Sequence, residues 1–372
     1  MRTRRLKNLD NVFLLGAGAS YALSLPSTAK PLTTTAPLDK DFNSRILDLK
    51  SRKNWVKDAI KSFDTNWVGR SHLRNYGLEE AILKRAGNFD LLNAIHRTRI
   101  HDRRNSIVKC ENSDYIKNLS HLIAEVLYNC RQNRQGAAKE FANLLFRDIY
   151  WVERGTGRRR RRRPTTRVIT FNYDTILDSE LIASGRIDED SLYFDRLGKD
   201  EESACTVLDR RVRKQPFPLI VKLHGSINWR VKEESFTTVV EGTCDRSDRI
   251  PIWLDWGSTP STNEPTCPLI VPPLPSKPIT RSSIFCHLWQ CALEYLHEAK
   301  RIIIVGYSCP ATDSFAVSLL ENIRNENLRE VIVVDPDIAA LKKYRSLLSG
   351  GIPDRVRWVY FDSLKAYMNA NR

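Results

Sequence analysis

The chain has 372 residues, 41% of them hydrophobic and 28% charged, so it can bury one large core or two modest ones. This composition is typical of a soluble globular protein, and no apolar run approaches the length of a membrane span, so we expect no membrane contact. The net charge of +15 favours anionic partners such as nucleic acid, an acidic protein surface or a phosphorylated small molecule.

The first predicted element is a buried strand that runs into a glycine-rich turn within Asn11–Ser20 (NVFLLGAGAS). A short apolar run that ends in such a turn predicts a parallel strand followed by a helix, here beginning at Ala19. A helix N-terminus carries unpaired N–H groups and a positive dipole end, and both suit a pyrophosphate. Gly16 and Gly18 have no Cβ atoms, so the backbone can approach such a ligand closely.

The middle of the chain is predicted to be helical from residue 42 to residue 153, because apolar residues recur at three- and four-residue spacings. The spacing is clearest over 78–85, 115–128 and 137–149. We interpret 42–153 as a helical insertion in one domain that is formed by residues 1–41 and 154–372.

Six consecutive arginines follow, between the chain-breaking residues Gly155 and Pro164. The run consists of Arg158, Arg159, Arg160, Arg161, Arg162 and Arg163. Like charges at this density repel one another and do not fold alone. The run is therefore an exposed linker, a nucleic-acid contact or a docking surface for an acidic protein partner.

Strands and helices alternate through the rest of the chain. Strands are predicted at 167–171, 218–223, 301–305, 330–334 and 356–361, and helices at 313–323 and 338–348. A hairpin-rich excursion is predicted at 228–256 and an irregular proline-rich segment at 268–278. The alternation predicts an α/β protein with a Rossmann-like parallel sheet, helices on both faces, and the first and last strands in that one sheet.

Small polar residues and glycines follow five of the predicted strands. Ligands bind at the carboxyl ends of the strands in an open parallel sheet, so these residues are the candidate site. They are GAGAS at 16–20, FNYDT at 171–175, HGS at 224–226, GYS at 306–308 and Asp335. The pattern is typical of a dinucleotide that lies along the sheet edge with reactive groups at one end.

The ordered set GAGAS, TFNYD, KLHGS, IVGYS and VVDPD resembles the sirtuin-like family, in particular its divergent bacterial branch of NAD-consuming defence proteins. The resemblance covers 11–24 and 167–361 and excludes the helical insertion. It implies that Asn172 and His224 form the catalytic pair. It also implies that NAD⁺, as substrate, is bound by Gly16, Ala17, Gly18, Ser20, Asp174, Gly306, Tyr307, Ser308 and Asp335.

Two departures from the family separate this chain from the deacetylating sirtuins. Those proteins carry four zinc-binding cysteines in two C-x-x-C pairs, whereas the eight cysteines here include no such pair. They also carry an aspartate-phenylalanine-arginine segment where this chain has LPSTAK at 25–30. We therefore expect NAD⁺ cleavage without a metal and without deacetylation. Scattered cysteines also predict a cytoplasmic location.

The expected chemistry suits these two residues. Nicotinamide leaves as a neutral molecule, so the reaction needs no carboxylic acid to protonate the leaving group, unlike ordinary glycoside hydrolysis. His224 can act as the base, and the amide of Asn172 can hold water or ribose hydroxyls. The predicted activity is an NAD⁺ glycohydrolase (NADase) that releases nicotinamide and ADP-ribose or its cyclic form.

The resemblance implies abortive infection as the role, in which NAD⁺ depletion provides antiviral defence. An unrestrained enzyme would kill its host, so we expect restraint by homo-oligomer formation or by a partner such as a HerA-like ATPase. The rival functions are a non-catalytic module that binds NAD⁺, ADP-ribose or nucleic acid, and an ADP-ribosyl transferase. The structural alternatives are a turn role for His224, helix caps at Asn172, Asp174 and Ser20, core packing for Tyr307 and a turn at Asp335.

Overall fold

The protein is described by a computed structural model that covers the following residues. They are 9–25, 36–38, 42, 45–46, 117, 119–128, 136–146, 150–152, 159–161, 165–185, 187, 192–193, 218–236, 252–255, 266–272, 283–310 and 313–372. The centre of the fold is a six-stranded parallel sheet in the order β11-β10-β9-β1-β4-β5. Its strands are β1 (Asn11–Leu15), β4 (Thr166–Thr170), β5 (Ile220–Lys222), β9 (Arg301–Val305), β10 (Glu330–Val334) and β11 (Arg357–Phe361).

This strand order confirms the predicted Rossmann-like α/β fold. Counted along the chain, the six strands lie in the order 3-2-1-4-5-6, which is the order of that fold. β1 is central because it pairs in parallel with both β4 and β9. Its apolar sequence NVFLL suits a strand that is covered on both faces, and Val12 and Leu14 are fully buried. The chain order reverses between β1 and β9, where such sheets bind ligands.

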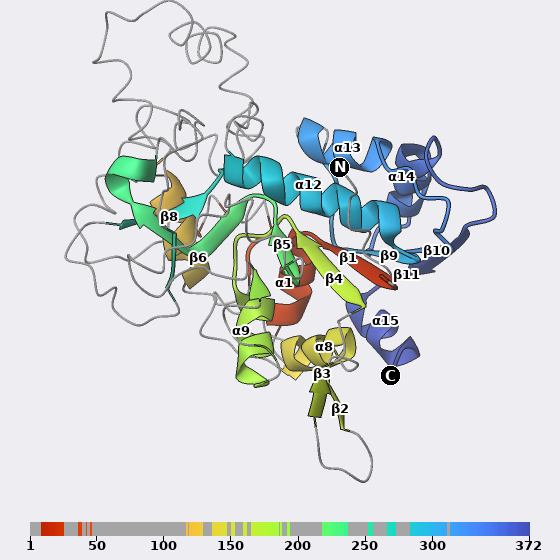
Figure 1. Cartoon of the computed structure of the whole chain (residues 1–372), viewed down its shortest axis with the longest axis horizontal. Coiled ribbons are helices and arrows are strands. Elements are labelled where there is room, and N and C mark those ends of the chain that lie inside the picture. The colour runs from red at the N-terminus through yellow and green to blue at the C-terminus, as the bar shows by residue number, and fades with distance from the viewer. Residues whose placement is uncertain are drawn as a thin grey trace, which may run out of the picture.

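Helices cover both faces of the sheet, as predicted (Figure 1). One face carries α12 (Ser283–Glu298), α13 (Ser314–Glu321) and α14 (Ala339–Leu348). The other carries α1 (Ala17–Ser24), α8 (Gly136–Phe146), α9 (Ile176–Ala183) and α15 (Leu364–Ala370). The ring of Phe13 in β1 lies edge-on to Phe141 of α8 and to Tyr367 of α15, with centroids 5.8 and 6.2 Å apart. The last helix therefore completes the core over the first strand.

The predicted helical insertion is described only in part. Residues 119–128 are helical, and α8 begins one residue before the predicted 137–149 helix. The helix predicted at 78–85 lies outside the described residues. α8 packs against α1 and α9, and its apolar stripe buries Phe141, Leu145 and Phe146. The described end of the insertion thus belongs to the core beneath the sheet.

Part of the arginine run forms a strand. β3 (Arg159–Arg161) pairs antiparallel with β2 (Tyr150–Val152). Tyr, Trp and Val are strong strand formers, so β2 offers a strand with which the arginines can pair. The arginine sequence by itself does not predict this pairing. The flanking Arg158, Arg162 and Arg163 lie outside the described residues.

A second, antiparallel sheet follows β5, in the order β7-β6-β8. It contains β6 (Gly225–Lys232), β7 (Trp253–Leu254) and β8 (Thr266–Ile270), which agrees with the predicted hairpin-rich excursion. The irregular segment predicted from residue 268 is wrong at its start, because Pro268 lies within β8, opposite Arg230. β8 is an edge strand, and an edge strand tolerates a residue that has no N–H to donate.

Two helices, α12 and α15, are absent from the sequence prediction. No helix in the described part of the chain is long and apolar enough to cross a membrane.

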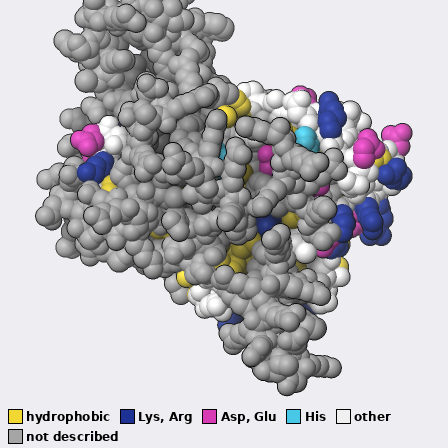
Figure 2. Space-filling model, in the orientation of Figure 1, with side chains coloured by type: hydrophobic (Ala, Val, Ile, Leu, Met, Phe, Trp, Pro, Cys, Tyr) yellow, Lys and Arg dark blue, Asp and Glu magenta, His cyan; other side chains and the backbone are white. Residues whose placement is uncertain are grey.

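Lys and Arg side chains stand beside Asp and Glu on the right-hand side of the face seen in Figure 2, so positive charge is interspersed with negative charge there.

Candidate active site

A cavity of about 760 Å³ lies at the carboxyl ends of the strands, beside the point where the strand order reverses. Its volume falls within the range of about 300–1,000 Å³ that is usual for small-molecule sites. All but one of the predicted site residues line it, namely Ala17, Gly18, Ser20, Asn172, Asp174, His224, Gly306, Tyr307, Ser308 and Asp335. The exception, Gly16, is hydrogen-bonded to Asn172.

Three glycines hold the start of α1 against the loop after β9. The Gly18 N–H donates to the Gly306 carbonyl at 2.9 Å, and Gly306 adopts a φ of +55°. A Cβ on Gly16 would lie only 2.5 Å from the Tyr307 Cα. As predicted, Gly16 and Gly18 allow another group to lie close to the backbone. In this structure that group is the backbone of Gly306 and Tyr307. The helix begins at Ala17, two residues earlier than predicted, because this contact orders its first turn.

Replacing Gly306 by alanine is expected to lower the free energy of unfolding by about 2–5 kcal/mol, since a left-handed φ and overpacking both disfavour a side chain. The new Cβ would lie 2.4 Å from the Ala19 backbone nitrogen. Gly350→Ala is the matched control, because no atom lies within 4 Å of the place that its new methyl group would take. Urea denaturation of both variants tests this, and equal losses in the two would contradict it.

The amide of Asn172 is fixed in one orientation. Its Nδ2 donates to the Gly16 carbonyl at 2.7 Å and to Ser20 Oγ at 2.7 Å. A carbonyl oxygen can only accept, so Nδ2 and not Oδ1 must face Gly16. Both amide hydrogens are thereby used, and Oδ1 is left as an acceptor at the cavity. With both amide hydrogens in use, Asn172 can offer a ligand only its oxygen, as a hydrogen-bond acceptor.

Asp174 stands behind Asn172 in the same hydrogen-bonded chain. Ser20 Oγ donates to Asp174 Oδ2 at 2.6 Å, and the Ile176 N–H donates to Oδ1 at 3.0 Å. Burial raises the pKa of the Asp174 carboxyl above its ordinary value, against the opposing effects of Lys222 and these donors. Asp174 therefore accepts from the first residue of α9 and from Ser20, but the N-cap residue of that helix is Thr175, so the cap expected at Asp174 is placed one residue too early.

His224 lies in the turn between β5 and β6 and is 4% exposed. The rings of Phe171, Tyr173 and Trp289 surround it, with centroids 5.7, 6.2 and 5.9 Å from the imidazole. Its carbonyl accepts from the Val271 N–H at 2.8 Å, which ties the turn to the residue that follows β8. The imidazole is thus held in an aromatic enclosure at one end of the cavity.

Asp313 is a cavity residue that the sequence analysis does not assign to the site. Its Oδ2 lies 3.6 Å from His224 Nε2 and accepts from the Tyr307 hydroxyl at 3.3 Å. Its Oδ1 accepts from the Ala316 N–H at 3.4 Å, so it also caps α13. A sequence signal is present, because the predicted helix at 313–323 begins with this aspartate. A carboxylate in this place would balance a positive charge on the histidine.

Tyr307, Ser308 and Asp335 also line the cavity. Tyr307 stacks on Phe171 with centroids 3.9 Å apart, so it packs as well as lines the site. The Ser308 carbonyl accepts from Lys343 Nζ at 2.7 Å. Asp335 accepts from the Asp337 N–H at 2.9 Å, which is the predicted turn, and partial burial raises the pKa of its carboxyl.

The cavity brings together polar groups of three kinds. It combines a histidine paired with a carboxylate, an oriented amide oxygen and the first turn of α1. Its charged lining among the described residues is acidic, with Asp174, Asp313, Asp335 and Asp362. No protein-family model matches the sequence of this chain, and no curated protein matches it either.

Proposed function

We propose that the protein is an NAD⁺ glycohydrolase. The observation that carries the proposal is the meeting of three strand ends at one cavity: the glycine-rich turn after β1, Asn172 after β4 and His224 after β5. A dinucleotide site at the reversal point of a parallel sheet is expected on physical grounds, because helix N-termini and strand ends converge there. The histidine and the amide add reactive groups to that site.

In the proposed reaction, water attacks the anomeric carbon of the ribose that bears nicotinamide. The bond between that carbon and the pyridinium nitrogen breaks, and its electron pair neutralises the departing ring. The oxygen of water bonds to the carbon, and its proton passes to His224. The products are nicotinamide, ADP-ribose and one proton.

Each residue has a role that follows from its contacts. Asn172 Oδ1 accepts a hydrogen bond from the water or from a ribose hydroxyl, because both amide hydrogens are already used. His224 is the general base, and Asp313 holds its ring and balances the charge it gains. Acidic groups around the cavity favour a ribosyl group that becomes positively charged in the transition state.

The resemblance to the sirtuin-like family extends the proposal to a biological role. By that resemblance, the protein acts in bacterial antiphage defence through depletion of NAD⁺ in the cytoplasm. Restraint comes from assembly as a homo-oligomer or from a HerA-like ATPase partner. The arginine run supplies a contact for nucleic acid or for an acidic protein.

The test is incubation of the purified full chain with NAD⁺, followed by chromatography of the products. We expect equal amounts of nicotinamide and ADP-ribose, with no product from heat-denatured protein. ADP-ribose that stays attached to protein or nucleic acid would replace the hydrolase by a transferase. NAD⁺ binding without nicotinamide release, with and without candidate partner proteins, would replace it by a sensor.

A further inference from the structure

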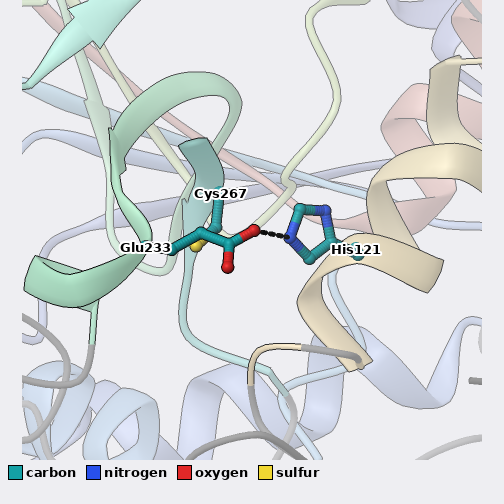
Figure 3. Close-up of side chains that lie close together, drawn as sticks. All are labelled: His121, Glu233 and Cys267. Carbon is teal, nitrogen blue, oxygen red and sulfur yellow. Dashed lines mark ion pairs between the residues drawn. The ribbon is translucent and has the colours of Figure 1, made fainter. Parts of the chain in front are cut away.

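Three side chains of different chemistry converge away from the cavity (Figure 3). His121 comes from the helical segment 119–128, Glu233 directly follows β6, and Cys267 lies in β8. Their nitrogen, oxygen and sulfur ligand atoms all lie within 4.8 Å of one another. His121 Nε2 and Glu233 Oε1 are 4.0 Å apart, so a small side-chain movement would bring them to the spacing of about 3.4 Å that two ligands have on one tetrahedral zinc ion.

We propose that His121, Glu233 and Cys267 form a Zn²⁺ site. Imidazole, carboxylate and thiolate are the three ligand types that zinc takes in proteins. Magnesium and calcium bind through oxygen ligands, so the sulfur and nitrogen here disfavour them. Three protein ligands leave a fourth position of the tetrahedron for water. The proposal stands apart from the NAD⁺ cavity and revises the sequence expectation that the protein binds no metal.

A metal ion at this site would have to compete with the neighbouring positive charge of Lys117. Lys117 Nζ lies 3.2 Å from Glu233 Oε2, so this ammonium group competes with a metal for the carboxylate. Cys267 is fully buried, and zinc binding would replace the proton of its thiol, which is released to water.

The proposed site would join two parts of the fold that also form the wall of the cavity. The segment 119–128 carries His121, and its residues Ile123 and Leu127 line the cavity. β8 carries Cys267 and leads into Val271, whose N–H donates to the His224 carbonyl and whose carbonyl accepts from Tyr173. Zinc would therefore fix the helix against the antiparallel sheet next to the histidine turn.

The experiment is a Co²⁺ titration of the full metal-free chain, because cobalt replaces zinc and its bond to a thiolate gives a near-ultraviolet charge-transfer band. We expect one equivalent of Co²⁺ to produce the band and one equivalent of Zn²⁺ to abolish it. Cys267→Ser should remove the band, and His121→Asn should weaken Co²⁺ binding by about 100-fold. Lys117→Met should strengthen it by about tenfold, since one competing positive charge is lost.

Cys291→Ser is the matched control, because Cys291 is also a buried thiol and lies 3.6 Å from a histidine, His287. It should leave the band and the affinity unchanged. His121 is partly exposed, so His121→Asn gives a result even where Cys267→Ser disturbs folding. Absence of the band in the wild-type chain, or its loss in Cys291→Ser alone, would overturn the proposal. None of these measurements depends on NAD⁺ cleavage.

Discussion

His224→Ala is expected to lower the rate of nicotinamide release by about 10²–10⁴-fold, the usual contribution of a general base. The affinity for ADP-ribose should change by less than about threefold, because the base acts on the attacking water and not on the bound dinucleotide. Initial rates and equilibrium binding, measured on the same preparations, separate these two effects.

The neighbouring residues make this prediction specific. Asn172→Ala should reduce the rate to a similar extent, since it removes the amide oxygen that Gly16 and Ser20 orient. Asp313→Asn should lower it by about 10²-fold, because the histidine loses the group that holds its ring. His287→Ala is the control, a histidine of α12 that does not line the cavity. Full activity in His224→Ala would mean that the base is another residue.

The order of strands and helices is predictable from the sequence, because apolar runs in a parallel sheet coincide with strands that are buried on both faces. The predicted bounds of β10 are the bounds that it has in the structure, since its last four residues, VIVV, form an apolar, β-branched run and the strand is buried on both faces. The sequence analysis does not assign α12, because aromatic and cysteine residues give it only a modest helix propensity. The helix nevertheless has a local signal, since apolar residues such as Ile284, Leu288 and Tyr295 recur at helical spacing and are buried.

The candidate site is predictable as far as strand ends determine it. The rule that ligands bind at the carboxyl edge brings Asn172 and His224 to one cavity, although 52 residues separate them in the chain. The sequence identifies Asp313 only as a helix start, because its approach to His224 depends on the loop after β9, where Cys309 takes a φ of +46°. Ile123 and Leu127 are not predictable as lining residues, since their position depends on how the insertion folds back.

Lys222→Met is expected to lower the free energy of unfolding by about 3–5 kcal/mol, the usual loss when one partner of a buried ion pair is removed. Lys222 is fully buried, and its Nζ lies 3.3 Å from Asp178 Oδ1 and donates to the Asp174 carbonyl. Methionine would fill the space but leave the Asp178 carboxylate without its cation. Urea denaturation, followed by tryptophan fluorescence, gives the loss.

Burial, and not the distance between the charges, decides the size of this effect. Lys300 Nζ lies only 2.6 Å from Asp10 Oδ1, yet the two side chains are 40% and 37% exposed. Water screens that pair, so Lys300→Met should cost no more than about 1 kcal/mol. Adding Asp178→Asn to Lys222→Met should restore part of the stability, because it removes the uncompensated charge. If the two lysine variants lose the same free energy of unfolding, burial does not set the strength of the Lys222 pair.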